Sequence, residues 1–284
     1  HLWMNTREGG FREEALSLGV AVNAFGVTEA SMGVAAGDID SDGDCDLFMT
    51  HLMNERNTLY VRTEYGFEDS SRESGLAVPS FPFTGFGTVM FDVDHDGDLD
   101  LAIANGRVMR GALDPRAGSD PLWGSYAEPN QFFLGDGKGQ FTDISNTDAA
   151  FCGAVEITRA LVLADLDTDG DLEMVVGNCR GPARIYENIA EKKGSWLQVR
   201  AIDKQLKRDV YGAVIRVHAG SRVVRRTVGP GRSYISSSMI TCHFGLGASQ
   251  VIDRIEVKWP GGATETFPGG ACNRVMTLTR GEGK

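Results

Sequence analysis

An acidic string of nine residues occurs three times and constrains this chain more than any other feature. The copies span residues 38–46, 92–100 and 165–173. Each has acidic residues at positions 1, 3, 5, 7 and 9 and a glycine at position 6. Five carboxylates so close together repel one another strongly unless a cation lies between them. The sequence therefore predicts a repeat architecture with a metal site in each repeat.

The spacing of the acidic residues is that of an oxygen cage for a hard cation. Carboxylates at positions 1, 3, 5 and 9 converge if the loop curls, and the glycine permits a sharp turn at which position 7 offers its carbonyl. Position 12, where an EF-hand carries glutamate, is Met49, Ile103 or Val176. The size and charge of the cage favour Ca²⁺. We predict about three Ca²⁺ sites, with these candidate ligands: Asp38, Asp40, Asp42, Asp44, Asp46, Asp92, Asp94, Asp96, Asp98, Asp100, Asp165, Asp167, Asp169, Asp171 and Glu173.

Short apolar runs surround each acidic string and predict strands of four to six residues. The predicted strands cover residues 33–37, 47–50, 57–61, 66–69, 87–91, 101–104, 130–134, 139–143, 160–164 and 174–177. Units of strand, acidic loop and three further strands favour the blades of a β-propeller. The second interval, 73 residues against 54, contains an insertion at residues 105–129. Such insertions commonly lie on the binding face.

The acidic strings and their flanking strands resemble the FG-GAP (or VCBS) repeats of integrin-α-type β-propellers, over about residues 1–190. The resemblance implies that each acidic loop joins the first two strands of a blade and that calcium stabilises the turn. It also implies an extracellular or periplasmic adhesion or recognition protein. A minority of the family are enzymes.

We expect an incomplete propeller of about three to four blades, whereas the family usually closes with seven. Residues 1–14 resemble the last two strands of a preceding blade, and residues 183–188 resemble the third strand of a following one. An open ring leaves an unpaired sheet edge. We expect further blades upstream of this sequence, and the alternative is that partner chains complete the ring.

Charge divides the chain into two parts. The formal net charge is −19 for residues 1–195 and +8 for residues 196–284. This difference predicts two domains, which we place at residues 1–192 and 193–284. Alternating patterns in the second part predict a small β-sandwich-like domain, so the whole chain is expected to be all-β. These predicted strands cover residues 196–201, 212–220, 221–228, 251–259, 264–267 and 274–279.

Four motifs in the second part occur in an order that is similar to the ASPIC/UnbV domain. They cover residues 211–217, 229–236, 243–247 and 255–262. This domain follows FG-GAP-like repeats in the cartilage acidic protein family and in bacterial relatives. The family is extracellular and its activity is poorly defined, so the resemblance implies an architecture more than a function.

The total charge of −11 is mostly a property of the acidic loops, since they contain fifteen carboxylates and the rest of the chain sums to +4. An acidic chain argues against nucleic acid as a partner. No apolar run approaches the roughly 18 residues of a membrane span.

A basic stretch formed by Arg222, Arg225, Arg226 and Arg232 suits a sulfated or carboxylated polysaccharide, and the alternatives are a solvated face or docking against the acidic propeller.

The five cysteines leave two interpretations open. No C-x-x-C pair occurs, which disfavours a thiolate zinc site. Two disulfides with local pairing, Cys152–Cys179 and Cys242–Cys272, would leave one thiol. The alternative is five free thiols.

The sequence favours a calcium-stabilised, extracellular or periplasmic module that binds protein or glycan, with membership of a larger assembly as an option. The alternative is a carbohydrate-active enzyme of lyase or isomerase type. Its candidates are His51, His95, His218 and Tyr126, although nothing in their spacing pairs them. We expect His243 to be structural, and we assign no catalytic residue.

Overall fold

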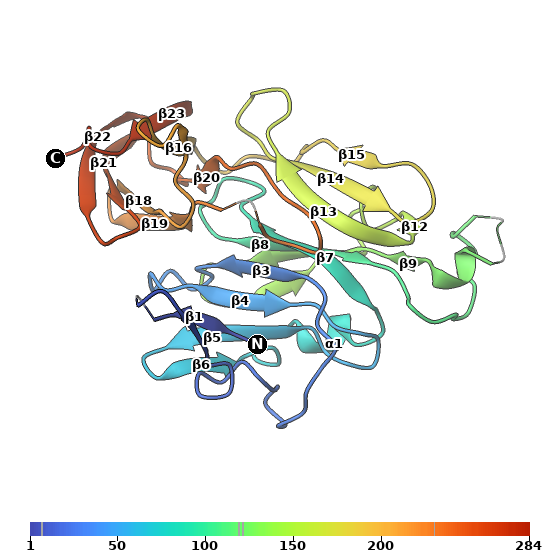
Figure 1. Ribbon diagram of the computed structural model, residues 1–284. Helices are drawn as coiled ribbons and strands as arrows, with labels where there is room; N and C mark the ends of the chain where they lie inside the picture. Colours follow the sequence, from blue (N-terminus) through green and yellow to red (C-terminus); the bar gives the residue numbers. More distant parts are fainter. Residues whose placement is uncertain (7, 119, 121, 230) are drawn as a thin grey trace.

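The computed structural model describes residues 1–6, 8–118, 120, 122–229 and 231–284. Two positions of the insertion and Pro230 of the 229–236 motif therefore lie outside the described residues. Within the described part, helix is confined to α1 (Ala77–Ser80) and the single 3₁₀ turn η1 (Gly124–Tyr126), and the other elements are strands (Figure 1). The prediction of an all-β fold is confirmed.

Three sheets have the form of propeller blades, with antiparallel strands in sequence order. The first contains β3 (Val34–Gly37), β4 (Asp46–Met49), β5 (Thr58–Thr63) and β6 (Gly66–Asp69). The second contains β7 (Gly85–Phe91), β8 (Asp100–Asn105), β10 (Gln131–Gly135) and β11 (Phe141–Asp143). The third contains β13 (Thr158–Ala164), β14 (Glu173–Asn178) and β15 (Arg184–Tyr186). Each acidic string joins the first two strands of its blade, as the resemblance implied.

The described propeller region also contains two short two-stranded sheets. It therefore has five sheets, whereas we predicted three to four blades. The two-stranded ribbons pair β1 (Trp3–Asn5) with β2 (Phe11–Glu13), and β9 (Glu128–Pro129) with β12 (Val155–Glu156). The β9–β12 ribbon was not predicted, because two-residue strands have no readable periodicity.

The assignment of residues 183–188 to a following blade is wrong. Strand β15 pairs with β14 and completes the third blade, with Met174 opposite Tyr186 and Val176 opposite Arg184. The connection after β14 is short, so β15 pairs with the nearest free sheet edge, which is the free edge of β14. An antiparallel neighbour needs only such a short turn.

The first strands of the three blades lie against one another at the centre of the propeller (Figure 1). Strand β7 is buried along its whole length between β3 and β13. The strands approach closely because Gly87 has no side chain: a Cβ there would lie 2.8 Å from the carbonyl oxygen of Arg159. Apolar side chains fill the space between neighbouring blades. Phe48, Leu101 and Phe133 pack between the first and second blades, and Phe132 and Leu161 pack between the second and third.

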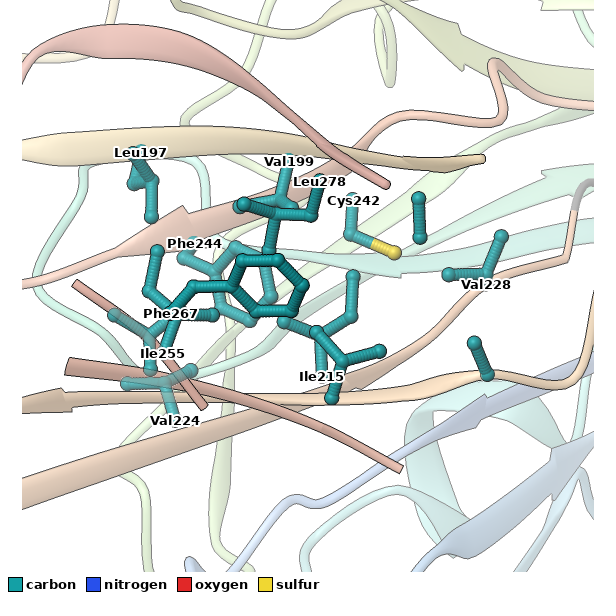
Figure 2. Packing of buried hydrophobic residues seen from close by; sticks show 14 of the residues in the cluster. Leu197, Val199, Ile215, Val224, Val228, Cys242, Phe244, Ile255, Phe267 and Leu278 are labelled. Carbon is teal, nitrogen blue, oxygen red and sulfur yellow. The ribbon is translucent and has the colours of Figure 1, made fainter. Parts of the chain in front are cut away.

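The C-terminal part is a sandwich of two sheets. One sheet has the order β17 (Arg208–Asp209), β16 (Trp196–Asp203) and β20 (Cys242–Gly245), with β23 (Arg274–Thr279) parallel to β16. The other has the order β19 (Arg222–Thr227), β18 (Val214–Ala219), β21 (Val251–Lys258) and β22 (Thr264–Ala271). Val199, Phe244 and Leu278 of the first sheet face Ile215 and Ile255 of the second in one buried core (Figure 2).

A segment of the C-terminal domain, residues 231–241, crosses the first strands of the three blades. Ser233 donates its backbone N–H to Val34 of β3 at 2.8 Å, and its hydroxyl accepts from Thr88 of β7 at 3.0 Å. The hydroxyl of Ser238 accepts from Leu163 of β13 at 3.1 Å. The segment therefore ties all three blades to the C-terminal domain.

All five cysteines are free thiols in the structure, which matches the second of the two interpretations left open. None of the described helices has the length and apolar character that a bilayer crossing requires.

Because Gly87 allows β7 to approach β13, we expect Gly87→Ala to destabilise the propeller. The added Cβ would meet backbone atoms of Arg159 and Leu161 at 2.8 Å, so the strands must separate, at a cost of about 2 kcal/mol. Urea denaturation followed by tryptophan fluorescence should show a lower midpoint.

Gly10→Ala is the matched control, since among the described residues its Cβ meets only the Thr6 hydroxyl, at 3.5 Å. Equal midpoints for the two variants would contradict close packing at Gly87.

Candidate metal centres

The three acidic loops share one backbone shape. Their position-6 glycines, Gly43, Gly97 and Gly170, have φ values of 91°, 95° and 101°. A side chain is rarely tolerated in this left-handed region, which explains the glycine at each position 6. Position 4 is also left-handed in all three loops, for example at φ 65° in His95. The three loops therefore repeat in backbone conformation as well as in sequence.

Each loop brings three carboxylate groups together, with oxygens within 4.8 Å of one another. In the first two loops these groups come from positions 1, 3 and 5, and in the third from positions 1, 3 and 9. The three groups are Asp38, Asp40 and Asp42; Asp92, Asp94 and Asp96; and Asp165, Asp167 and Glu173.

The position-9 carboxylates hold the loops to their blades. Both oxygens of Asp46 accept backbone N–H groups, from Ile39 at 3.0 Å and from Arg62 of β5 at 2.8 Å. Asp100 does the same with Val93 at 2.9 Å and Gly135 of β10 at 3.0 Å. The acidic string predicts these residues only as ligands, because their bonds to the third strand of each blade join residues far apart in the sequence.

The position-7 side chains point to other partners. Asp44 is exposed. Asp98 pairs with Arg222 at 3.0 Å, and Asp171 pairs with Lys192 at 2.7 Å. These carboxylates are among the candidate ligands. Because their side chains have other surroundings, the group that position 7 can offer to an ion is its backbone carbonyl.

The surroundings of the position-1 carboxylates indicate whether a cation fits in the loops. Asp38 accepts the N–H of Gly43 at 3.1 Å, and Asp92 accepts the N–H of Gly97 at 2.7 Å, in both cases through Oδ2. The other oxygen, Oδ1, is buried in each residue and has no hydrogen-bond partner among the described residues. A buried carboxylate oxygen without a partner is costly. An all-oxygen donor set with an unsatisfied buried oxygen fits Ca²⁺, which when bound would neutralise the loop.

Burial makes the charged forms of several loop carboxylates unfavourable. It raises the pKa of Asp46 to about 6, that of Asp92 to about 7 and that of Asp100 to about 8. Neighbouring carboxylates raise these pKa values further, while backbone N–H donors lower them. A cation between the carboxylates would act in the opposite direction.

The C-terminal domain and the segment leading into it supply positive and polar groups to two of the loops. Lys193 contacts Asp94 at 2.6 Å and Asp96 at 2.9 Å in the second loop. Gln198 of β16 donates to Asp165 of the third loop at 2.6 Å. In the described part of the chain, no lysine or arginine makes an ion pair with the first loop. The three loops therefore have different surroundings.

The histidines considered for catalysis lie with separate partners. His51 lies 3.7 Å from Glu29, and His218 lies 3.2 Å from Glu256 in the C-terminal sheet. His95 and His243 lie together at the domain interface, with ring centroids 5.0 Å apart. Burial lowers the pKa of both, so they are neutral at pH 7. His243 is buried, and its Nε2 has no hydrogen-bond partner among the described residues, so a structural role for it stays a prediction.

Comparison with known families supports the architecture. The family described as FG-GAP-like repeat matches residues 38–103, and the family described as ASPIC and UnbV matches residues 203–284. The chain therefore contains an FG-GAP-like repeat and an ASPIC and UnbV domain, as its motifs predicted.

Two curated relatives align with nearly the whole chain. Cartilage acidic protein 1 of Xenopus tropicalis is 25% identical over 293 residues, and Cartilage acidic protein 1 of Homo sapiens is 23% identical over 299 residues. Both alignments cover 98% of this chain and 40% of the relative. The chain thus spans about two fifths of the length of the curated relatives it matches.

The first loop offers a direct test of the ligand set. Asp38→Asn keeps the acceptor for Gly43 but removes the charge beside the proposed ion, so we expect calcium binding at this loop to be lost. Asp44→Asn, in the same loop, changes an exposed side chain and should leave binding intact. Isothermal titration with Ca²⁺ should give one site fewer for Asp38→Asn only. Equal stoichiometry in both variants would refute the assignment.

The raised pKa values predict opposite pH trends with and without metal. Because Asp46, Asp92 and Asp100 have raised pKa values in the fold, their contribution to stability is present at low pH and is lost as pH rises through about 6 to 8. Calcium needs the deprotonated ligands, so its stabilisation grows over the same range.

Differential scanning fluorimetry of metal-depleted and calcium-loaded protein at pH 5 to 8 checks this expectation. The gap in Tm should widen with pH to on the order of 10 °C, since each site at 100 times its Kd contributes about 2.7 kcal/mol. A gap that is absent, or constant with pH, would rule out calcium in these loops.

Proposed function

We propose that this chain is a calcium-stabilised, extracellular or periplasmic module that binds protein or glycan through the insertion at residues 105–129. The FG-GAP-like repeat and the ASPIC and UnbV domain support the extracellular setting, as does similarity to Cartilage acidic protein 1. Calcium is structural in this proposal, because the acidic loops join strands within the blades. Membership of a larger assembly is compatible with it.

The base of the insertion is firmly anchored. Glu128 is fully buried and accepts from Arg107 at 3.0 Å and from the backbone of Thr84 at 2.9 Å. Arg107 also donates to the carbonyl oxygen of Ala112 at 2.8 Å. Arg159 of β13 donates to the carbonyl of Arg107 at 2.9 Å. A buried, charge-assisted network of this kind holds the protruding loop in a defined position.

The main observation behind the proposal is a pocket of about 340 Å³ beside the insertion. It lies between the insertion and residues 153–157 and 180–184. Trp123 is 39% exposed at its wall, and the guanidinium of Arg180 lies 5.8 Å from the centre of the indole. Arg184 and Glu156 form two hydrogen bonds of 2.6 Å at the same wall. An exposed indole beside charged donors and acceptors suits a sugar ring or a side chain of a partner protein.

The enzyme alternative has no comparable support. His51, His218 and Tyr126 belong to the first blade, the C-terminal sheet and the insertion, respectively. General acid–base chemistry needs two groups within hydrogen-bond reach of one substrate. We therefore do not propose a catalytic activity.

Arrays of neutral, sialylated and sulfated glycans and of purified ectodomains, probed with the calcium-loaded chain, test this function. We expect Trp123→Ala to weaken binding to the recognised probe at least tenfold, which corresponds to about 1.4 kcal/mol. Trp3→Ala is the matched control, because Trp3 is also exposed but lies on the β1–β2 ribbon. Binding that is absent, or equal for the two variants, would overturn the proposal.

A further inference from the structure

A second hollow lies between the first blade and the C-terminal domain and has a volume of about 230 Å³. Gly37 and Cys45 line it on the propeller side. Arg225, Arg226 and Arg232 line it on the side of the C-terminal domain. A neighbouring cavity, which reaches Asp92, shares Arg226 and Arg232 with this cleft. Arg225, Arg226 and Arg232 therefore all line one partly enclosed space.

These three arginines lack the carboxylate partners that such groups normally have. Within the described residues, none of them has a carboxylate oxygen within 4.0 Å. Their hydrogen bonds go to main-chain carbonyls: Arg226 donates to Arg225 at 2.9 Å, and Arg232 donates to Thr227 at 2.8 Å. The Nε of Arg225 and one terminal nitrogen of Arg226 are buried and have no hydrogen-bond partner in the part of the chain that the structure describes. Buried donors of this kind are normally satisfied.

Among the described residues, Arg222 is the one arginine of the basic stretch that makes an ion pair with the acidic propeller. Arg222 donates to the carbonyl oxygen of Asp96 and pairs with Asp98 at 3.0 Å. The other three members of the stretch, which line the cleft, make no such pair. They therefore need a different explanation from the docking that Arg222 performs.

The carboxylates nearest to Arg226 are already committed. Asp92 and Asp38 attract its charge, but both are position-1 residues of the acidic loops. Burial lowers the pKa of Arg226, and repulsion from Arg232 lowers it as well. If cations occupy the loops, the negative charge of Asp38 and Asp92 is balanced there. The cleft then holds about three positive charges with no negative charge of its own.

We propose that this cleft is a binding site for a tetrahedral oxyanion, a phosphate or a sulfate, held by Arg225, Arg226 and Arg232. Such an anion accepts several charge-assisted hydrogen bonds at once, which would satisfy the buried donors. The volume exceeds that of the anion itself, so the group can arrive free or as an ester on a sugar. The site is separate from the pocket beside Trp123, and it does not depend on the function proposed for that pocket.

Isothermal titration of the calcium-loaded full chain tests the site with sodium sulfate and sodium phosphate as probes, at constant ionic strength in chloride. We expect one equivalent to bind with a Kd of about 1 mM or tighter. Arg225→Gln and Arg232→Gln should each weaken binding at least tenfold. Both residues are only partly buried, and the Tm of each variant reports whether it still folds. If one variant fails to fold, the other decides.

Arg208→Gln is the matched control, because Arg208 is an exposed arginine of the same domain at the far sheet edge. It should bind as the unchanged chain does. Absence of saturable binding up to about 10 mM, or equal binding by all three variants, would overturn the proposal.

A sulfated disaccharide distinguishes the two sources of the anion. If it binds at least tenfold more tightly than inorganic sulfate, the group enters the cleft on a glycan. If inorganic phosphate binds as tightly as the disaccharide or more tightly, the free ion is the ligand. Either result supports the oxyanion site.

Discussion

Repulsion among the carboxylates of the acidic loops is the constraint on which the rest of this structure depends. Fifteen carboxylates lie in three short turns, and burial makes the charged forms of Asp92 and Asp100 unfavourable. Backbone N–H groups bind one oxygen of Asp38 and of Asp92, both oxygens of Asp165, and one or both oxygens of each position-9 carboxylate. The buried oxygens that remain, on Asp38 and Asp92, are where a cation would be most stabilising.

The same excess of negative charge explains why the two domains lie together. The C-terminal domain and its leading segment carry Lys193 and Arg222 to the second loop, where both contact its carboxylates. Residues 231–241 add hydrogen bonds to the first strand of each blade. Cation binding in the loops and docking of the C-terminal domain therefore involve the same carboxylates. A change in one should alter the free energy of the other.

The two hollows suit different ligands because their walls differ. The pocket beside the insertion combines an exposed indole with charged groups that already pair with each other, which favours a partner with both apolar and polar surface. The cleft at the domain interface has unpaired guanidinium groups and buried donors, which favours a small anion. The first is built within the propeller, whereas the second exists only when both domains are present.

The sequence by itself determined the repeat, the strands that surround it and the residue types of the acidic loops, because these depend on local spacing and on the glycine that each turn needs. The tertiary structure alone decided that β15 completes the third blade, that Asp46 and Asp100 reach the third strand of their blades, and which arginines are paired. Those outcomes depend on contacts between residues far apart in the chain. Nothing in local periodicity encodes which distant groups will meet.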